Sequence, residues 1–221
     1  MRCAFCHNPD TWDPRGAVQY EMTPQELFEE TMRYYNFIRK GGVTCTGGEP
    51  LMQAAFVAEY FRLCHKEGLH TALDTSGVIF GEAGTLVPDK AVSDAVGESD
   101  LVMLDIKTMD DDMHKSYTGV PSQSNRAFLR YLQKIGKPTW IRHVVVPGYT
   151  DVPERLEALA RHARGFDVVE RVELLPYHTM GVYKYRELGL DYRLEGVPPL
   201  GDDALEKARD IFRSILDCKI C

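Results

Sequence analysis

Residues 43–61 read VTCTGGEPLMQAAFVAEYF and contain three elements in one short stretch. Residues 43–46 are β-prone, and the glycines Gly47 and Gly48 end that run. Pro50 suits the first turn of a helix, where its missing N–H costs nothing, and apolar residues follow at helical spacing. The stretch therefore predicts a strand, a glycine turn and a helix, which is the repeating unit of α/β proteins.

The same unit recurs along the chain. Further strands are expected at 70–74, 101–106, 139–146 and 171–175, and helices at 23–40, 89–96, 153–164 and 202–216. Strands that alternate with helices form a parallel sheet, either doubly wound or curved toward a barrel. Residues 177–201 are rich in Gly, Pro and Tyr, and we expect a loop there that crosses the mouth of the sheet.

Length and composition limit what the protein can do. A chain of 221 residues with no linker is expected to form a single domain, residues 1–221. Its net charge of −7, with acidic and basic residues interspersed, argues against nucleic acid as a partner. No apolar run is long enough to span a bilayer, and the first residues lack the order of a signal peptide. We therefore expect no membrane partner and a cytoplasmic location.

Charged residues and glycines follow the predicted strands where each strand ends. These ends read TGGE (46–49), DTSG (74–77), DIK (105–107), VPG (146–148) and PYH (176–178). Because the carboxyl ends of parallel strands meet at one edge of the sheet, the five ends predict a functional site at that edge. For Gly47 and Gly48, the alternative is an ordinary strand-to-helix turn.

The six cysteines include two pairs with C-x2-C spacing. Cys3 and Cys6 can reach one metal centre from a single turn, and the spacing alone leaves zinc, an iron-sulfur cluster or an inert pair open. Cys218 and Cys221 could complete a four-thiolate zinc site with them, although an exposed tail is the simpler expectation. The remaining cysteines, at positions 45 and 64, are expected to be small core residues.

Several motifs, taken together and in order, resemble the pyruvate formate-lyase activating enzyme family of radical S-adenosylmethionine enzymes. They are MRCAFCHN (1–8), GGEP (47–50), LDTSG (73–77), MLDIK (103–107), WIR (140–142), VVVPG (144–148) and ELLPYH (173–178). The resemblance implies a partial (β/α)6 TIM-like barrel whose first strand lies upstream of this chain. Cys3 and Cys6 match the second and third cysteines of the family's C-x3-C-x2-C motif, and the first is expected two residues before Met1.

The resemblance also implies the chemistry. In the family, three cysteines hold a 4Fe-4S cluster whose open iron binds S-adenosylmethionine. One-electron reduction then yields a 5′-deoxyadenosyl radical that takes a hydrogen atom from a backbone glycine of the partner protein. No cysteine lies between Cys6 and Cys45, which favours the type that activates pyruvate formate-lyase in anaerobic metabolism with an external donor such as reduced flavodoxin. Activation of another glycyl-radical enzyme and a non-catalytic zinc protein are the alternatives.

Site residues carry over position by position, and none is assigned a catalytic role because the cofactor supplies the reactive chemistry. The implied cofactor-binding residues are Phe5, Cys6, His7, Gly47, Gly48, Glu49, Asp74, Thr75, Asp105, Ile106, Lys107, Arg142 and His178. Two carboxylates in one mouth also need a positive charge between them. The family implies a monovalent cation held by Asp74, Thr75, Met103 and Asp105, and two solvated strand ends are the alternative.

Overall fold

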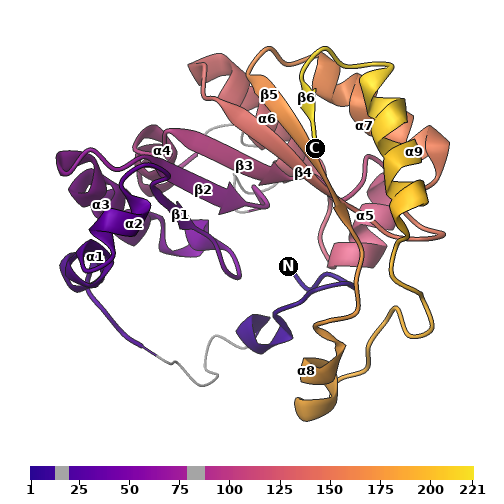
Figure 1. Ribbon diagram of the computed structural model, residues 1–221, viewed down its shortest axis with the longest axis horizontal. Coiled ribbons are helices and arrows are strands. Elements are labelled where there is room, and N and C mark those ends of the chain that lie inside the picture. Colours follow the sequence, from indigo (N-terminus) through magenta and orange to yellow (C-terminus); the bar gives the residue numbers. More distant parts are fainter. Residues whose placement is uncertain (13–19, 79–87) are drawn as a thin grey trace.

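The computed structural model describes residues 1–12, 20–78 and 88–221. One sheet of six parallel strands, in chain order from edge to edge, forms its centre (Figure 1). The strands are β1 (Val43–Cys45), β2 (Thr71–Thr75), β3 (Leu101–Asp105), β4 (Thr139–Val145), β5 (Val169–Pro176) and β6 (Lys219–Ile220). The predicted α/β fold is therefore confirmed, with parallel strands that follow one another as in a TIM-like barrel.

Helices connect successive strands. The described helices are α1 (Pro24–Met32), α2 (Tyr35–Ile38), α3 (Ala54–Lys66), α4 (Lys90–Gly97), α5 (Asp111–Thr118), α6 (Gln123–Ile135), α7 (Pro153–Arg164), α8 (Val182–Glu187) and α9 (Asp202–Arg213). Two short 3-10 helices are η1 (Pro9–Trp12) and η2 (Pro50–Gln53). Figure 1 shows α3, α4, α6, α7 and α9 along the outside of the sheet, whereas η1 and α8 lie on its other side.

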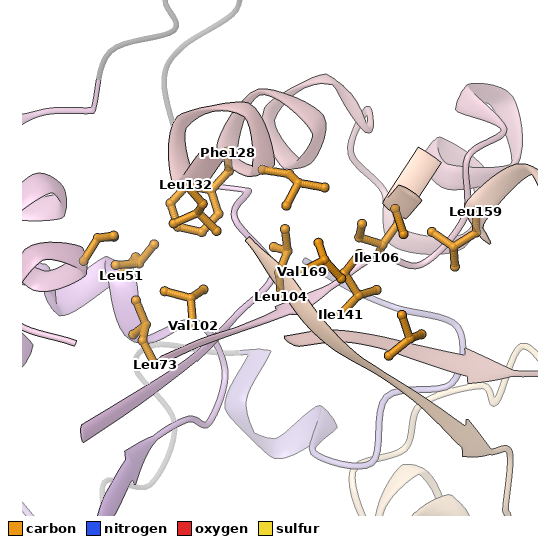
Figure 2. Close-up of a cluster of buried hydrophobic side chains, with 14 of the residues drawn as sticks. Leu51, Leu73, Val102, Leu104, Ile106, Phe128, Leu132, Ile141, Leu159 and Val169 are labelled. Atoms are coloured by element: carbon orange, nitrogen blue, oxygen red, sulfur yellow. The ribbon is translucent and has the colours of Figure 1, made fainter. Parts of the chain in front are cut away.

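Alternation along the strands separates two faces of the sheet. The outer face carries the apolar residues of the main core, which pack against the outer helices. Figure 2 shows Leu104 and Ile141 pointing from the sheet toward the helix that carries Phe128, and all three side chains are fully buried. The opposite, concave face carries the alternate positions of the same strands, which include Asp74, Asp105 and Arg142 in place of apolar residues.

A close approach fixes where β2 ends. Gly77 has φ +64°, and a Cβ atom there would lie 2.8 Å from Cδ1 of Phe128. Glycine is therefore required both for the backbone conformation and for the contact with α6. The same contact holds the carboxyl end of β2 against the outer helix layer.

Three expectations about secondary structure are wrong. The helix expected at 23–40 is divided into α1 and α2, because Thr31 Oγ1 donates to the carbonyl of Leu27, four residues earlier, and such bonds bend helices. Residues 177–201 contain the short helix α8. The C-terminal residues, expected to be an exposed tail, include β6, and Cys221, directly after that strand, bonds to the backbone of Val172 and Leu174 in β5.

Other local expectations are confirmed. Thr23 caps α1 in a capping box with Glu26, and Pro24 occupies the first turn. Cys64 is fully buried in the main core, and Cys45 packs against that core. Among the described helices, none has the length and apolar character needed to cross a bilayer.

We expect removal of residues 218–221 to lower the free energy of unfolding by about 1–3 kcal/mol, because the Leu174 N–H and the Val172 carbonyl lose their partners and Ile220 loses its contacts with the core. Urea denaturation measures this loss. The control Lys219→Ala removes an exposed side chain but keeps every backbone bond, so its midpoint should stay unchanged. Equal midpoints for the deletion and this control would contradict the role given to β6.

Candidate active site

The strand register places four charged residues together on the concave face. Asp105 of β3 pairs with Arg142 of β4, and Arg142 pairs with Glu173 of β5, so the three lie in one row across the sheet. Asp74 of β2 lies beside this row, opposite Met103. Two of the predicted strand ends, 74–77 and 105–107, therefore lie on neighbouring strands at the same edge of the sheet.

Arg142 is the positive centre of this row. Its Nη1 lies 2.6 Å from Oδ2 of Asp74, and its Nε lies 3.4 Å from Oε2 of Glu173 without a hydrogen bond. Thr46 Oγ1 also donates to Oδ2 of Asp74 at 2.9 Å. Burial and the nearby Asp105 raise the pKa of Asp74, and Arg142 opposes that shift. The guanidinium thus partly compensates a carboxylate that the fold has removed from water.

Lys107 joins the sheet to the N-terminal segment. Its Nζ lies 2.8 Å from Oδ2 of Asp105 and 5.5 Å from the ring centroid of Phe5, and only 10% of its side chain is exposed. Burial alone would lower the pKa of Lys107, but the Asp105 carboxylate and other anionic groups raise it above its usual value. Burial raises the pKa of the Cys3 thiol, which the ammonium of Lys107 opposes.

The glycine turn after β1 is fixed by Glu49. Its carboxylate accepts hydrogen bonds from Thr75 Oγ1 at 2.6 Å, from Ser76 N at 3.0 Å and from the Ser76 hydroxyl. Gly47 has φ +127°, and a Cβ atom there would meet no described atom within 4 Å. A bound molecule could therefore approach the backbone at Gly47 closely, whereas a Cβ atom at Gly48 would lie 3.4 Å from Oγ1 of Thr11.

The cysteine segment, residues 3–12, lies across the concave side of the sheet. Its start is tied to the end of α5, because the N–H groups of Arg2 and Ala4 donate to the carbonyls of Thr118 and Tyr117. Cys3 and Cys6 share one turn, in which Cys6 N–H donates to the Cys3 carbonyl at 3.1 Å, and both thiols are free.

His7 and His178 meet at the other side of the mouth. Their rings stack with centroids 4.0 Å apart, and His7 Nε2 lies 3.2 Å from the carbonyl oxygen of His178. Burial lowers the pKa of His7, and the hydrogen bond to the His178 carbonyl opposes part of that shift. Two residues from opposite ends of the chain that the sequence assigns to the cofactor site are thus in contact.

Two predicted residues differ in their surroundings from the rest. Ile106 points into the main core, its N–H donates to the Arg142 carbonyl, and its own carbonyl lies 2.8 Å from Nδ1 of His143. This geometry does not favour a cofactor contact by Ile106. Phe5 is buried against Tyr117, with ring centroids 6.0 Å apart, in a small second core beneath the cysteine segment.

The described residues contain no group of three or more His, Cys, Asp or Glu side chains arranged to hold a metal ion. The pair Cys218 and Cys221 lies at the β6 edge and does not join Cys3 and Cys6. The four-thiolate zinc site considered from the sequence is therefore wrong. Asp74 and Asp105 each have a cationic partner from the protein, Arg142 and Lys107 respectively.

Sequence reasoning missed two residues that hold the site. Ser76 binds Glu49, and it could have been suspected from its place in the DTSG strand end. Asn125 of α6 is buried, and its Nδ2 donates to the carbonyls of Ser76 at 2.9 Å and Asp105 at 2.8 Å. Nothing in a helical sequence marks Asn125 as a link between two strand ends.

Comparison with known proteins agrees with this geometry. Residues 1–163 match the Radical SAM superfamily. The pyruvate formate-lyase 1-activating enzyme of Escherichia coli strain K12 is 40% identical over 214 residues, which cover 96% of this chain and 84% of that protein. The pyruvate formate-lyase-activating enzyme of Streptococcus mutans is 42% identical over 215 residues, covering 97% of this chain and 81% of that protein.

Solved structures support the fold. A radical SAM methyltransferase from Sphaerobacter thermophilus superposes with a TM-score of 0.67 at 16% identity, over 99% of this chain and 61% of that chain. A domain of pyruvate-formate lyase-activating enzyme from Bacteroides vulgatus superposes with a TM-score of 0.64 at 22% identity, over 82% of this chain and 98% of that chain.

The parallel sheet, with a cysteine pair and a glycine turn at its carboxyl edge, defines a radical SAM protein. Radical SAM proteins use a 4Fe-4S cluster and S-adenosylmethionine. Within that superfamily, the chain belongs to the pyruvate formate-lyase-activating enzyme family.

We expect Asn125→Ala to lower the free energy of unfolding by about 1–3 kcal/mol, because the buried carbonyls of Ser76 and Asp105 lose a shared donor. Chemical denaturation measures the change. Asn36→Ala, at an exposed position in α2, is the matched control and should stay within about 0.5 kcal/mol of the parent. Equal losses in the two variants would contradict the bridging role of Asn125.

The buried His143 predicts a pH dependence of stability. Burial lowers the pKa of His143 in the folded state, so the unfolded chain binds a proton that the folded chain excludes. Stability is therefore complete above about pH 6.5 and falls as the pH drops below it, by at most about 1.4 kcal/mol per pH unit. His143→Gln keeps a donor for the Ile106 carbonyl but cannot titrate. Between pH 7.5 and 5.5, the free energy of unfolding of this variant should change less with pH than that of the parent protein. An equal change in both would refute the assignment of the pH dependence to His143.

Proposed function

We propose that this protein activates pyruvate formate-lyase by generating a glycyl radical on it. The observation that carries the proposal is the identity of about two residues in five to activating enzymes, spread over 96% of the chain. That similarity accompanies a mouth where the cysteine turn, the glycine turn and the charged strand ends converge. The protein substrate is proposed from the relatives, whose names specify pyruvate formate-lyase.

The residues present fit the cofactors of the superfamily. Cys3 and Cys6 are free thiols on one turn, and the third cysteine ligand stays a prediction, two positions before Met1. A Cβ atom at Gly47 would meet no described atom within 4 Å, so a ligand can reach the backbone there. We assign Cys3 and Cys6 to the 4Fe-4S cluster, and Gly47, Gly48 and His178 to S-adenosylmethionine.

The charged row gives the remaining assignments. Lys107 is the ammonium available for a carboxylate at the mouth, and Arg142 holds Asp74 in place. Glu49 and Thr75 bind each other, so both support the glycine turn as well as lining the mouth. A monovalent cation at Asp74, Thr75, Met103 and Asp105 stays part of the proposal, and it would compete with Arg142 and Lys107 for the carboxylates.

Held by Cys3 and Cys6 beside S-adenosylmethionine at Gly47 and Gly48, a 4Fe-4S cluster would supply the electron for reductive cleavage of S-adenosylmethionine, and with it the means to remove a hydrogen atom from a glycine of the substrate protein. The chain's own residues position the bound groups. Lys107 is buried in its ion pair with Asp105, whereas the stacked rings of His7 and His178 are half-buried and Gly47 is exposed. Reduced flavodoxin is proposed as the electron donor, and the cytoplasm as the location.

The test uses the chain extended at its N-terminus so that a cysteine stands two positions before Met1, reconstituted anoxically with iron and sulfide. With S-adenosylmethionine, a reductant and pyruvate formate-lyase, we expect equal amounts of methionine and 5′-deoxyadenosine and a glycyl-radical signal in electron paramagnetic resonance. Cys6→Ala should reduce both products to background, because one cluster ligand is lost. Cys218→Ala, at the β6 edge, is the matched control and should keep both.

Two results would overturn the proposal. One is a colourless protein that holds stoichiometric zinc after reconstitution. The other is a protein that cleaves S-adenosylmethionine but leaves no radical on pyruvate formate-lyase, which would indicate a different glycyl-radical enzyme as the substrate.

A further inference from the structure

The cysteine segment has little backbone support of its own. Among the described residues, its backbone bonds to another element end at Ala4, and the later ones, from Cys6 to Cys3 and from Thr11 to Asn8, are local. A segment held mainly by local turns opens easily unless side chains hold it. Residues 5–12 therefore need support from another part of the molecule, and Figure 1 shows η1 close to α8.

Tyr185 of α8 provides the first contact. Its hydroxyl donates to the backbone carbonyl of Cys6 at 3.0 Å, and only 1% of the residue is exposed. Its ring meets the ring of Trp12 edge-on, with centroids 5.7 Å apart. One side chain thus touches both Cys6 and the far end of the cysteine segment.

Lys184 provides the second contact. Its Nζ donates to Oδ1 of Asn8 and to Oδ1 of Asp10, each at 3.0 Å. The hydrogen bond from Lys184 lowers the pKa of Asp10, so the carboxylate is charged at neutral pH. A single ammonium therefore joins two points of the segment on the side of Cys6 away from the sheet.

Gly181 allows this approach. A Cβ atom at Gly181 would lie 2.9 Å from Cα of His7, so a larger residue would push α8 away from the segment. The stack of His7 on His178 lies directly beside this contact. The start of α8 and the residue after Cys6 are packed backbone to backbone.

We propose that Lys184 and Tyr185 are positioning residues that hold Cys6 and the rest of the cysteine segment at the mouth of the sheet. Neither side chain contacts a thiol. Tyr185 acts through the backbone carbonyl of Cys6, and Lys184 acts through the side chains of Asn8 and Asp10. This role rests on the proposed function, because it has a catalytic consequence only if the cysteine segment binds the cluster. The contacts of Lys184 and Tyr185 with the cysteine segment can be tested in the absence of any cofactor.

The test compares thiol alkylation of the cofactor-free protein, followed by peptide mass spectrometry. Tyr185→Phe removes one hydroxyl, and Lys184→Met removes the ammonium but keeps a chain of similar length. We expect alkylation at Cys3 and Cys6 to be roughly five-fold faster in each variant, and faster still in the double variant. Cys64, fully buried in α3, is the internal control, and Tyr183→Phe, at an exposed position on α8, is the matched control variant.

A second readout separates positioning from general stability. In the reconstituted protein carrying an added cysteine two positions before Met1, the double variant should release iron to a chelator several-fold faster, while the alkylation rate of the buried Cys64 in the cofactor-free chain stays unchanged. Alkylation at Cys3 and Cys6 that does not change in the double variant overturns the proposal. Faster alkylation of Cys64 also overturns it, because it shows a structural role only. Faster alkylation in the variants, together with a parent protein that does not cleave S-adenosylmethionine, would support the positioning role and reject the proposed function.

Discussion

The buried ion pair between Lys107 and Asp105 is the interaction on which the site depends. A charge removed from water is tolerated only with a partner, and loss of either member of a buried pair typically costs about 3–5 kcal/mol. Here the pair also lies between the sheet and the cysteine segment, because Lys107 lies over Phe5 and acts electrostatically on Cys3. The ion pair of Arg142 and Asp74 provides the same compensation one strand away.

The strand register explains how these charges come together. Outer-face positions of β2, β3 and β4 are apolar and packed against the helices, so the alternate positions must point to the concave side. Arg142 occupies such a position in the middle of β4, and Asp74 and Asp105 occupy such positions near the carboxyl ends of β2 and β3. Their convergence could be predicted from the sequence, since the carboxyl ends of parallel strands share one edge. The same reasoning predicted the five strands β1 to β5.

Other features could not be predicted, for physical reasons. Which carboxylate pairs with which cation depends on register, and the sequence predicts strands without their register. Asn125 acts on two strand ends from a helix, so no local pattern identifies it. The two residues of β6 are too few for a strand pattern, and α8 lies in a stretch whose Gly, Pro and Tyr content predicted a loop. Family resemblance supplied the cofactors, which spacing alone left open between zinc and iron.

The central claim is that the cluster and S-adenosylmethionine bind at the concave mouth formed by the cysteine turn and the strand ends. The most direct test is an iron-edge anomalous difference map from crystals of the anoxically reconstituted protein with S-adenosylmethionine, in which an N-terminal extension supplies a cysteine two positions before Met1. We expect one iron peak within bonding distance of Sγ of Cys3 and Cys6, and S-adenosylmethionine along Gly47 and Gly48. Iron bound at Cys218 and Cys221, or S-adenosylmethionine outside the mouth, would contradict it.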